Sequence, residues 1–246
     1  MTTQDKLAAK KRWPVVVRAG VGAIVGLAIG LAWARLHAGS PAAHPAHSFR
    51  NVMASFERAG FTRGVLVSYL LFIIFSLYWE AASGKASENK TAESGWSRGI
   101  HLALVSAGQL LVLVPVPGLR ARFLPSSMLL AVLGLWVEAA GILFAIWARR
   151  SLGRNWSGAV AIKVDQQLVR SGPYRFVRHP IYSGLLGMYA GLTLVSGEVH
   201  ALAGMVLVCG AYWRKIRLEE DYLHRLFGAA YDEYRSSTRA VVPGVW

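Results

Sequence analysis

Four long apolar runs constrain the fold of this chain more than any other feature of the sequence. They cover residues 14–36, 61–79, 99–117 and 126–148, and their ionisable side chains lie near the ends, except for Glu138. A helix of about 20 apolar residues crosses a hydrocarbon core about 30 Å thick. Each run therefore predicts a membrane-spanning helix, and the chain is predicted to be an all-α, polytopic membrane helix bundle. The first run is longer than a signal-peptide core of about 7 to 15 residues, so we expect it to be retained as a span.

Two shorter apolar runs, 181–197 and 199–213, are separated only by Gly197 and Glu198. They predict a tight helical hairpin whose ends return to the same side of the membrane, whether it crosses fully or only dips in. The polar sequence that follows has helical spacing and predicts a cytoplasmic C-terminal amphipathic helix. The bundle then has about five to six membrane helices. We divide the chain into an N-terminal transmembrane region, residues 1–148, and a region rich in polar motifs, residues 149–246.

The basic residues give the orientation. With the N-terminus inside, the segments predicted to face the cytoplasm hold 20 of the 27 lysines and arginines. Short cytoplasmic loops carry such an excess of positive charge. The segments 149–180 and 214–246 are therefore predicted to share the cytoplasmic side, which in a bacterium is the inner side of the inner membrane.

Several other classes of site are disfavoured. A net charge of +14 suits nucleic acid, but the basic residues flank apolar runs and cover no soluble face, so no nucleic-acid partner is expected. Cys209 is the only cysteine, which excludes an intrachain disulfide and a thiolate metal site. His44 and His47 lie in a loop in which no carboxylate or cysteine completes a coordination set, so no metal site is predicted.

Turn formers, cations and aromatic residues concentrate in residues 149–184. The sequence Ser-Gly-Pro-Tyr at 171–174 predicts a turn, and Pro180 suits the first turn of the following helix. Arg178 and His179 are then held just before that helix, at the membrane surface. Two interpretations stay open: these cations anchor the loop at the cytoplasmic interface, or they form a site for an anion at a helix N-terminus.

A carboxylate on the apolar face of the C-terminal helix is the second signal. Helical spacing places Glu219 on one stripe with Ile216, Tyr222 and Leu223. Glu219 either pairs with a cation of the preceding loop or receives polar groups of a ligand. By the same spacing, Glu220 lies on the solvated face.

Taken together, SGPYRFVRHPIYSG at 171–184, an apolar hairpin, and EEDYLHRLFGAAYDEYRSSTRAVVP at 219–243 resemble the isoprenylcysteine carboxyl methyltransferases and phospholipid methyltransferases of membranes. The resemblance covers roughly residues 150–246. It implies S-adenosylmethionine as the methyl donor, bound between the loop and the C-terminal segment; no GxGxxG dinucleotide loop is present. In this resemblance Glu219 and Glu220 hold the amino-acid or ribose end of the donor. The residues implied to line the cofactor site are Leu168, Val169, Gly172, Tyr174, Arg178, His179, Pro180, Tyr182, Glu219 and Glu220.

The resemblance also suggests where the acceptor lies. The lead-in GRNWS at 153–157, with Arg154 and Asn155, is implied to face the reacting methyl group, and Arg239 to hold an anionic acceptor. Residues 1–148 then form the acceptor side. The expected acceptor is lipophilic or lipidated and arrives from the bilayer, and a carboxylate like that of isoprenylcysteine is favoured over a phospholipid amine or a thiol. A carboxylate needs no general base, whereas an amine must be neutral and a thiol ionised.

Glu138, near the middle of the fourth run, is a further candidate catalytic residue, because an intramembrane carboxylate is costly to bury and is often functional. The alternative is a structural Glu hydrogen-bonded to a group such as Gln109. Two other function classes remain open. A transporter uses polar residues at mid-depth, and a membrane scaffold leaves the paired motifs incidental. The sequence gives no oligomeric state.

Overall fold

The computed structural model describes residues 62–83, 89–158, 160–163 and 166–242. The predicted span at 14–36, together with His44 and His47, lies outside these described residues. The chain divides into two units, one up to Ala82 and one from Ser83 onward. The first unit contributes helix α3, Arg63–Ser83, which covers the predicted run at 61–79.

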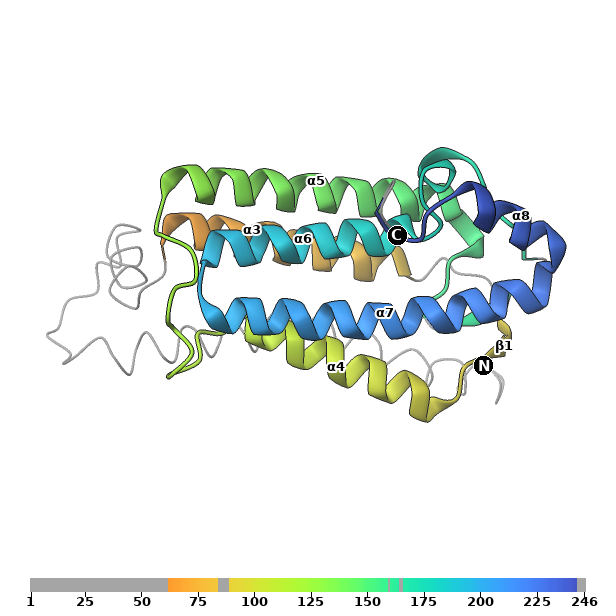
Figure 1. The fold of residues 1–246 in the computed structure, drawn as a ribbon, viewed down its shortest axis with the longest axis horizontal. Helices are drawn as coiled ribbons and strands as arrows, with labels where there is room; N and C mark the ends of the chain where they lie inside the picture. Colours follow the sequence, from red (N-terminus) through yellow and green to blue (C-terminus); the bar gives the residue numbers. More distant parts are fainter. Residues whose placement is uncertain (1–61, 84–88, 159, 164–165, 243–246) are drawn as a thin grey trace, which may run out of the picture. The chain divides into compact units, whose positions relative to one another are not determined.

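The second unit is mainly helical, and its long helices run beside one another as rods (Figure 1). α5 packs along α6, α6 along α7, and α7 along α4. A short antiparallel pair of strands joins the segment before α4 to the segment after α5. The elements are β1 (Asn89–Ala92), α4 (Gly95–Leu113), α5 (Met128–Leu152), the 3₁₀ helix η1 (Gly153–Asn155), β2 (Ala161–Lys163), the 3₁₀ helix η2 (Gly172–Arg175), α6 (Pro180–Ser196), α7 (Val199–Phe227) and α8 (Ala229–Ser237).

The structure confirms the helical hairpin. α6 ends at Ser196, and Gly197 turns the chain with a φ of 64°, a left-handed conformation that glycine adopts without steric cost. α7 begins at Val199 and continues without interruption to Phe227. The apolar second arm of the hairpin and the polar C-terminal segment therefore form one helix, which fixes Glu219 rigidly to the hairpin.

Glycines let the helices approach closely. Gly141 of α5 faces Gly184 of α6, and Gly108 of α4 faces Gly204 of α7. A Cβ atom added at Gly141 would lie 2.5 Å from the backbone N of Met188 and 2.6 Å from the carbonyl O of Gly184. Backbone contacts of this kind are typical of membrane helices. The hydrophobic effect does not drive such helices together, and small residues allow close van der Waals packing instead.

We expect Gly141→Ala to destabilise the α5–α6 pair by about 1–3 kcal/mol, because the added methyl group meets backbone atoms that have no room to move. Gly210→Ala is the matched control, since a Cβ there has no neighbour within 4 Å and the residue is exposed on α7. Thermal unfolding of the purified protein in detergent measures both effects. Equal midpoints for the two variants would show that the close helix contact does not limit stability.

Among the described helices, Arg63–Ala82 and Met128–Leu152 are long and apolar enough to cross a membrane. Large apolar side chains on α5 point outward: Leu129 is 66% exposed, Trp136 71% and Leu143 66%. Such an apolar surface is unfavourable in water but matches a lipid environment. The number of spans that the whole chain makes stays a prediction.

The loop between α4 and α5 is fastened to the turn of the hairpin. Arg120 donates two hydrogen bonds to the carboxylate of Glu198, at 3.2 and 3.3 Å. The buried ring of His200 lies between the same carboxylate, 3.1 Å away, and the carbonyl O of Leu111, 2.6 Å away. This end of the bundle is therefore closed by its own side chains, and Arg178 and His179 lie at the opposite end, where α6 begins.

Candidate active site

The turn at 171–175 leads into α6 as the sequence predicts. Gly172 has a φ of 60°, and Pro173 and Tyr174 are buried within η2. A Cβ at Gly172 would lie 2.9 Å from Ser151 Oγ, so glycine is needed both for its conformation and for its contact with the end of α5. Pro180 occupies the first turn of α6 and His179 precedes it.

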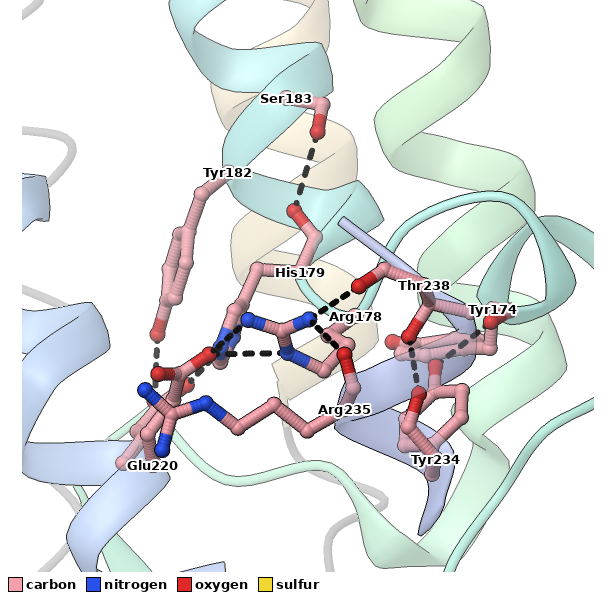
Figure 2. A network of polar contacts seen from close by, with 10 residues as sticks. Tyr174, Arg178, His179, Tyr182, Ser183, Glu220, Tyr234, Arg235 and Thr238 are labelled. Carbon is pink, nitrogen blue, oxygen red and sulfur yellow. Dashed lines mark hydrogen bonds and ion pairs between the residues drawn. The ribbon is translucent and has the colours of Figure 1, made fainter. Parts of the chain in front are cut away.

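Arg178 is bound by three separate parts of the chain (Figure 2). Its Nε and Nη2 atoms donate to Oε1 of Glu220 on α7, at 2.9 and 2.7 Å. Its Nη1 atom donates to the carbonyl O of Arg235 at 3.2 Å and also to that of Thr238. The side chains of Arg178 and Glu220 are only 8% and 10% exposed. This buried ion pair joins the loop, α7, α8 and the tail.

His179 lies between two carboxylates. Its Nδ1 atom is 3.5 Å from Oε2 of Glu219, and its Nε2 atom is 3.5 Å from Oε1 of Glu220. Burial lowers the pKa of His179, but the hydrogen bonds and charges of the two glutamates outweigh it and leave the pKa raised. The two carboxylates therefore favour the protonated form of the imidazole, which lies between them.

Both glutamates are held as anions. Burial alone would raise the pKa of Glu219, but His179, Lys215 and the hydroxyl of Tyr182 lower it overall. Burial opposes ionisation of Glu220 too, but His179 and Arg178 lower its pKa to about 2. The Tyr182 hydroxyl donates to Oε1 of Glu219 at 2.5 Å. Two ionised carboxylates on consecutive residues thus face the start of α6.

Aromatic rings continue from this cluster between the helices. Tyr182 stacks on His179 with ring centroids 5.7 Å apart, and on Tyr212 of α7 with centroids 5.1 Å apart. Tyr212 in turn lies 5.7 Å from the ring of His101 on α4. The rings of Tyr182 and Tyr212 therefore form an aromatic wall beside the polar cluster, between α6 and α7.

The C-terminal tail completes the site with its backbone. The N–H of Arg178 donates to the carbonyl O of Arg239 at 2.8 Å, and the N–H of His179 to that of Ala240 at 2.9 Å. Ser183 Oγ donates to the carbonyl O of Val241 at 2.5 Å. The tail thus supplies acceptors to the two residues that precede α6 and to Ser183 in its first turn.

The lead-in after α5 lies near the same end of the bundle. Asn155 Oδ1 accepts a hydrogen bond from the N–H of Gln167 at 3.1 Å, which joins the lead-in to the segment that carries Leu168 and Val169. Leu168 and Val169 are both half-buried. Of Arg154, only the backbone is described, as the middle residue of η1.

The side chains of Glu138 and Arg239, two of the predicted site residues, lie outside the cluster. Glu138 is fully buried where α5 contacts Gly191 of α6. Gly191 lies twelve residues beyond His179 along α6, which corresponds to about 18 Å of helix. The side chain of Arg239 is exposed, and the residue joins the site through its carbonyl group.

The expectation that Glu220 faces solvent is wrong. Glu220 is 8% exposed, because Arg178 comes from another segment to meet it, a contact that helical spacing alone does not reveal. Sequence reasoning also missed Lys215, Tyr212 and the backbone role of Thr238. Lys215 had a usable signal, since it precedes Glu219 by four residues and so lies on the same face of α7.

Comparisons with known proteins cover this region. Residues 129–230 match the family model described as phospholipid methyltransferase. Protein-S-isoprenylcysteine O-methyltransferase A of Arabidopsis thaliana is 31% identical over 134 residues, which are 52% of this chain and 64% of that protein. The Saccharomyces cerevisiae protein-S-isoprenylcysteine O-methyltransferase is 30% identical over 121 residues, 48% of this chain and 51% of that protein. These matches confirm the resemblance seen in the sequence, and each spans less than two thirds of the relative.

Proposed function

We propose, from the chain's similarity to isoprenylcysteine and phospholipid methyltransferases, that it is an integral membrane methyltransferase that uses S-adenosylmethionine to methylate a lipophilic acceptor. The observation that carries the proposal is the meeting of His179 and Glu219, whose Nδ1 and Oε2 atoms are 3.5 Å apart although 40 positions separate them in the chain. The loop and α7 thus meet in one cluster of polar side chains, which supports a shared site.

The chemistry of the cluster fits the donor. S-adenosylmethionine carries an ammonium, a sulfonium and ribose hydroxyls, and Glu219 and Glu220 are anionic acceptors that suit such groups. The rings of Tyr182 and Tyr212 offer faces that attract a cation. When bound, the donor supplies a sulfonium methyl group that is already activated toward displacement. The rest of the donor leaves as a neutral thioether. The remaining task of the protein is to align the donor and the acceptor.

For the acceptor we propose the carboxylate of an isoprenylcysteine-like compound, as the names of the relatives indicate. A phospholipid amine and a thiol are the alternatives within the same reaction class. The acceptor enters from the bilayer, and the water-soluble donor enters from the cytoplasm, where the positive-inside pattern places the cluster and the N-terminus. We also propose residues 149–246 as the methyltransferase region and residues 1–148 as the acceptor side. A transporter is disfavoured because the described polar cluster lies at one end of the helices.

Isothermal titration calorimetry of the detergent-solubilised protein with S-adenosylmethionine or S-adenosylhomocysteine tests donor binding. We expect Glu219→Gln to weaken binding at least about tenfold, because it removes one charge-assisted acceptor. Glu233→Gln is the matched control, since Glu233 is an exposed carboxylate paired with Arg170 on the surface. A wild-type protein that gives no heat with either compound contradicts the proposal and favours a transporter or a scaffold.

Methyl transfer identifies the acceptor class. The full-length protein is incubated with radiolabelled S-adenosylmethionine and either a farnesyl-cysteine analogue or a membrane lipid extract. Label in the farnesyl compound supports the carboxylate acceptor, and label confined to phospholipid supports the amine acceptor instead.

A further inference from the structure

Lys215 lies inside the candidate site, although neither the motifs nor the family match gives it a role. Its side chain leaves α7 one turn before Glu219 and is 7% exposed. Nζ donates to the carbonyl O of Gly158 at 3.0 Å and lies 5.7 Å from the centre of the Tyr182 ring. A buried cation therefore stands between the carboxylate cluster and the segment that follows η1.

This ammonium group is under-coordinated. An ammonium has three N–H donors, and among the described residues the carbonyl of Gly158 is the one hydrogen-bond acceptor for Lys215. Burial lowers the pKa of Lys215, and the charges of Glu219 and Glu93 partly oppose that effect. A buried cation is costly unless it is paired and hydrogen-bonded. The two remaining donors suit an anionic ligand.

The position of Lys215 along α7 indicates which ligand this is. Four residues separate it from Glu219, so it lies about 6 Å nearer the apolar arm of the hairpin. With the hairpin in the membrane, as its apolar sequence predicts, a water-soluble donor held by Glu219 and Glu220 would lie on the side of Lys215 away from the bilayer. A lipophilic acceptor that arrives from the bilayer meets Lys215 first, beside the aromatic wall formed by Tyr182 and Tyr212.

We propose that Lys215 is a specificity-determining residue that binds the carboxylate of the lipophilic acceptor. This inference rests on the proposed function and deepens it, because it explains how a carboxylate is preferred over an amine at this site: a buried ammonium attracts the anion and repels a protonated amine. The aliphatic part of Lys215 and the aromatic wall contact the apolar part of the acceptor. The alternative is a purely structural role, in which Lys215 fixes the backbone at Gly158 and does nothing more.

Equilibrium binding separates the two roles without requiring turnover. The full-length protein in phosphatidylcholine nanodiscs, with S-adenosylhomocysteine present, is titrated with radiolabelled N-acetyl-S-farnesylcysteine and with its methyl ester. The two probes differ by one methyl group, which removes the negative charge of the head group. We expect the wild type to bind the acid at least about tenfold more tightly than the ester, because an ionic hydrogen bond is lost in the ester.

Three variants complete the test. Lys215→Met keeps the length of the side chain and is expected to abolish the preference for the acid while leaving the affinity for the ester unchanged. Lys215→Arg keeps the charge and is expected to retain most of the preference. Arg217→Met, which removes a cation from the exposed face of the same helix, is the control and is expected to change neither affinity.

The outcomes are distinct. A wild type without acid preference, or a Lys215→Met variant that keeps the preference, overturns the proposal. A Lys215→Met variant that loses acid, ester and S-adenosylhomocysteine binding together shows the structural role and also overturns it. Repeating the titration in phosphatidylglycerol nanodiscs tests whether an anionic lipid phosphate occupies Lys215 in place of the acceptor carboxylate. A preserved preference for the acid over the ester supports the proposal, and loss of that preference contradicts it. The two proposals fail separately. Absence of donor binding in calorimetry contradicts the proposed function, whereas absence of the acid preference in the nanodisc titration contradicts the role of Lys215.

Discussion

Arg178→Met is expected to destabilise the protein by about 3–5 kcal/mol and to abolish donor binding, because it leaves the buried carboxylate of Glu220 with only the more distant imidazole of His179, 3.5 Å away, as an ionic partner. The same substitution removes the hydrogen bonds to the carbonyl groups of Arg235 and Thr238. One side chain thus supports the contacts of α7, α8 and the tail with the loop. The loss exceeds that of an ordinary surface ion pair because the remaining carboxylate of Glu220 does not regain full hydration in the folded variant.

An exposed ion pair in the same region serves as the control for Arg178. Arg170 pairs with Glu233 at 3.1 Å, but their side chains are 40% and 75% exposed. Arg170→Met is therefore expected to cost less than about 1 kcal/mol. Thermal unfolding in detergent and calorimetric titration with S-adenosylhomocysteine measure both variants. Similar losses for Arg178→Met and Arg170→Met would show that burial of the first pair has no energetic consequence.

The sequence predicted the helices well where a single local rule decides them. The hairpin follows from two apolar runs and a Gly197-Glu198 turn, and the start of α6 follows from Pro180, whose missing N–H is tolerated in the first turn. The close contact between Gly141 and Gly184 was not predicted, because either glycine alone is compatible with any helix face. Only the pairing of two distant segments shows why those positions need glycine.

In the candidate site, too, local sequence rules predict some residues, whereas others depend on contacts between distant segments. Arg178, His179 and Glu219 were singled out because cations before a helix and a carboxylate on an apolar stripe each require a local explanation. The burial of Glu220 and the position of Lys215 depend on which segment covers α7, and helical spacing contains no such information. Backbone acceptors such as the carbonyl of Ala240 have no sequence signature, because every residue type provides one.

The tail supports the second large prediction. A chain that ends at Ser237 is expected to lose donor binding completely, because it removes the acceptors of the N–H groups of Arg178 and His179 and one acceptor of the Arg178 guanidinium, the carbonyl O of Thr238. Each buried donor left without a partner costs about 1–3 kcal/mol. The truncation also removes the buried side chains of Ala240 and Val241. The combined loss approaches the whole stability of a typical domain, about 5–15 kcal/mol.

A chain that ends at Val242 is the matched control, since it keeps the carbonyl groups of Arg239, Ala240 and Val241 and every tail hydrogen bond described above. It is expected to bind S-adenosylhomocysteine like the full-length protein in calorimetry and to unfold at a similar temperature. We therefore expect the full-length protein and the chain ending at 242 to have similar affinities for S-adenosylhomocysteine, and the chain ending at 237 not to bind it. Donor binding by the shortest chain at wild-type affinity would mean that the tail only covers the site and that α6, α7 and the loop assemble it alone.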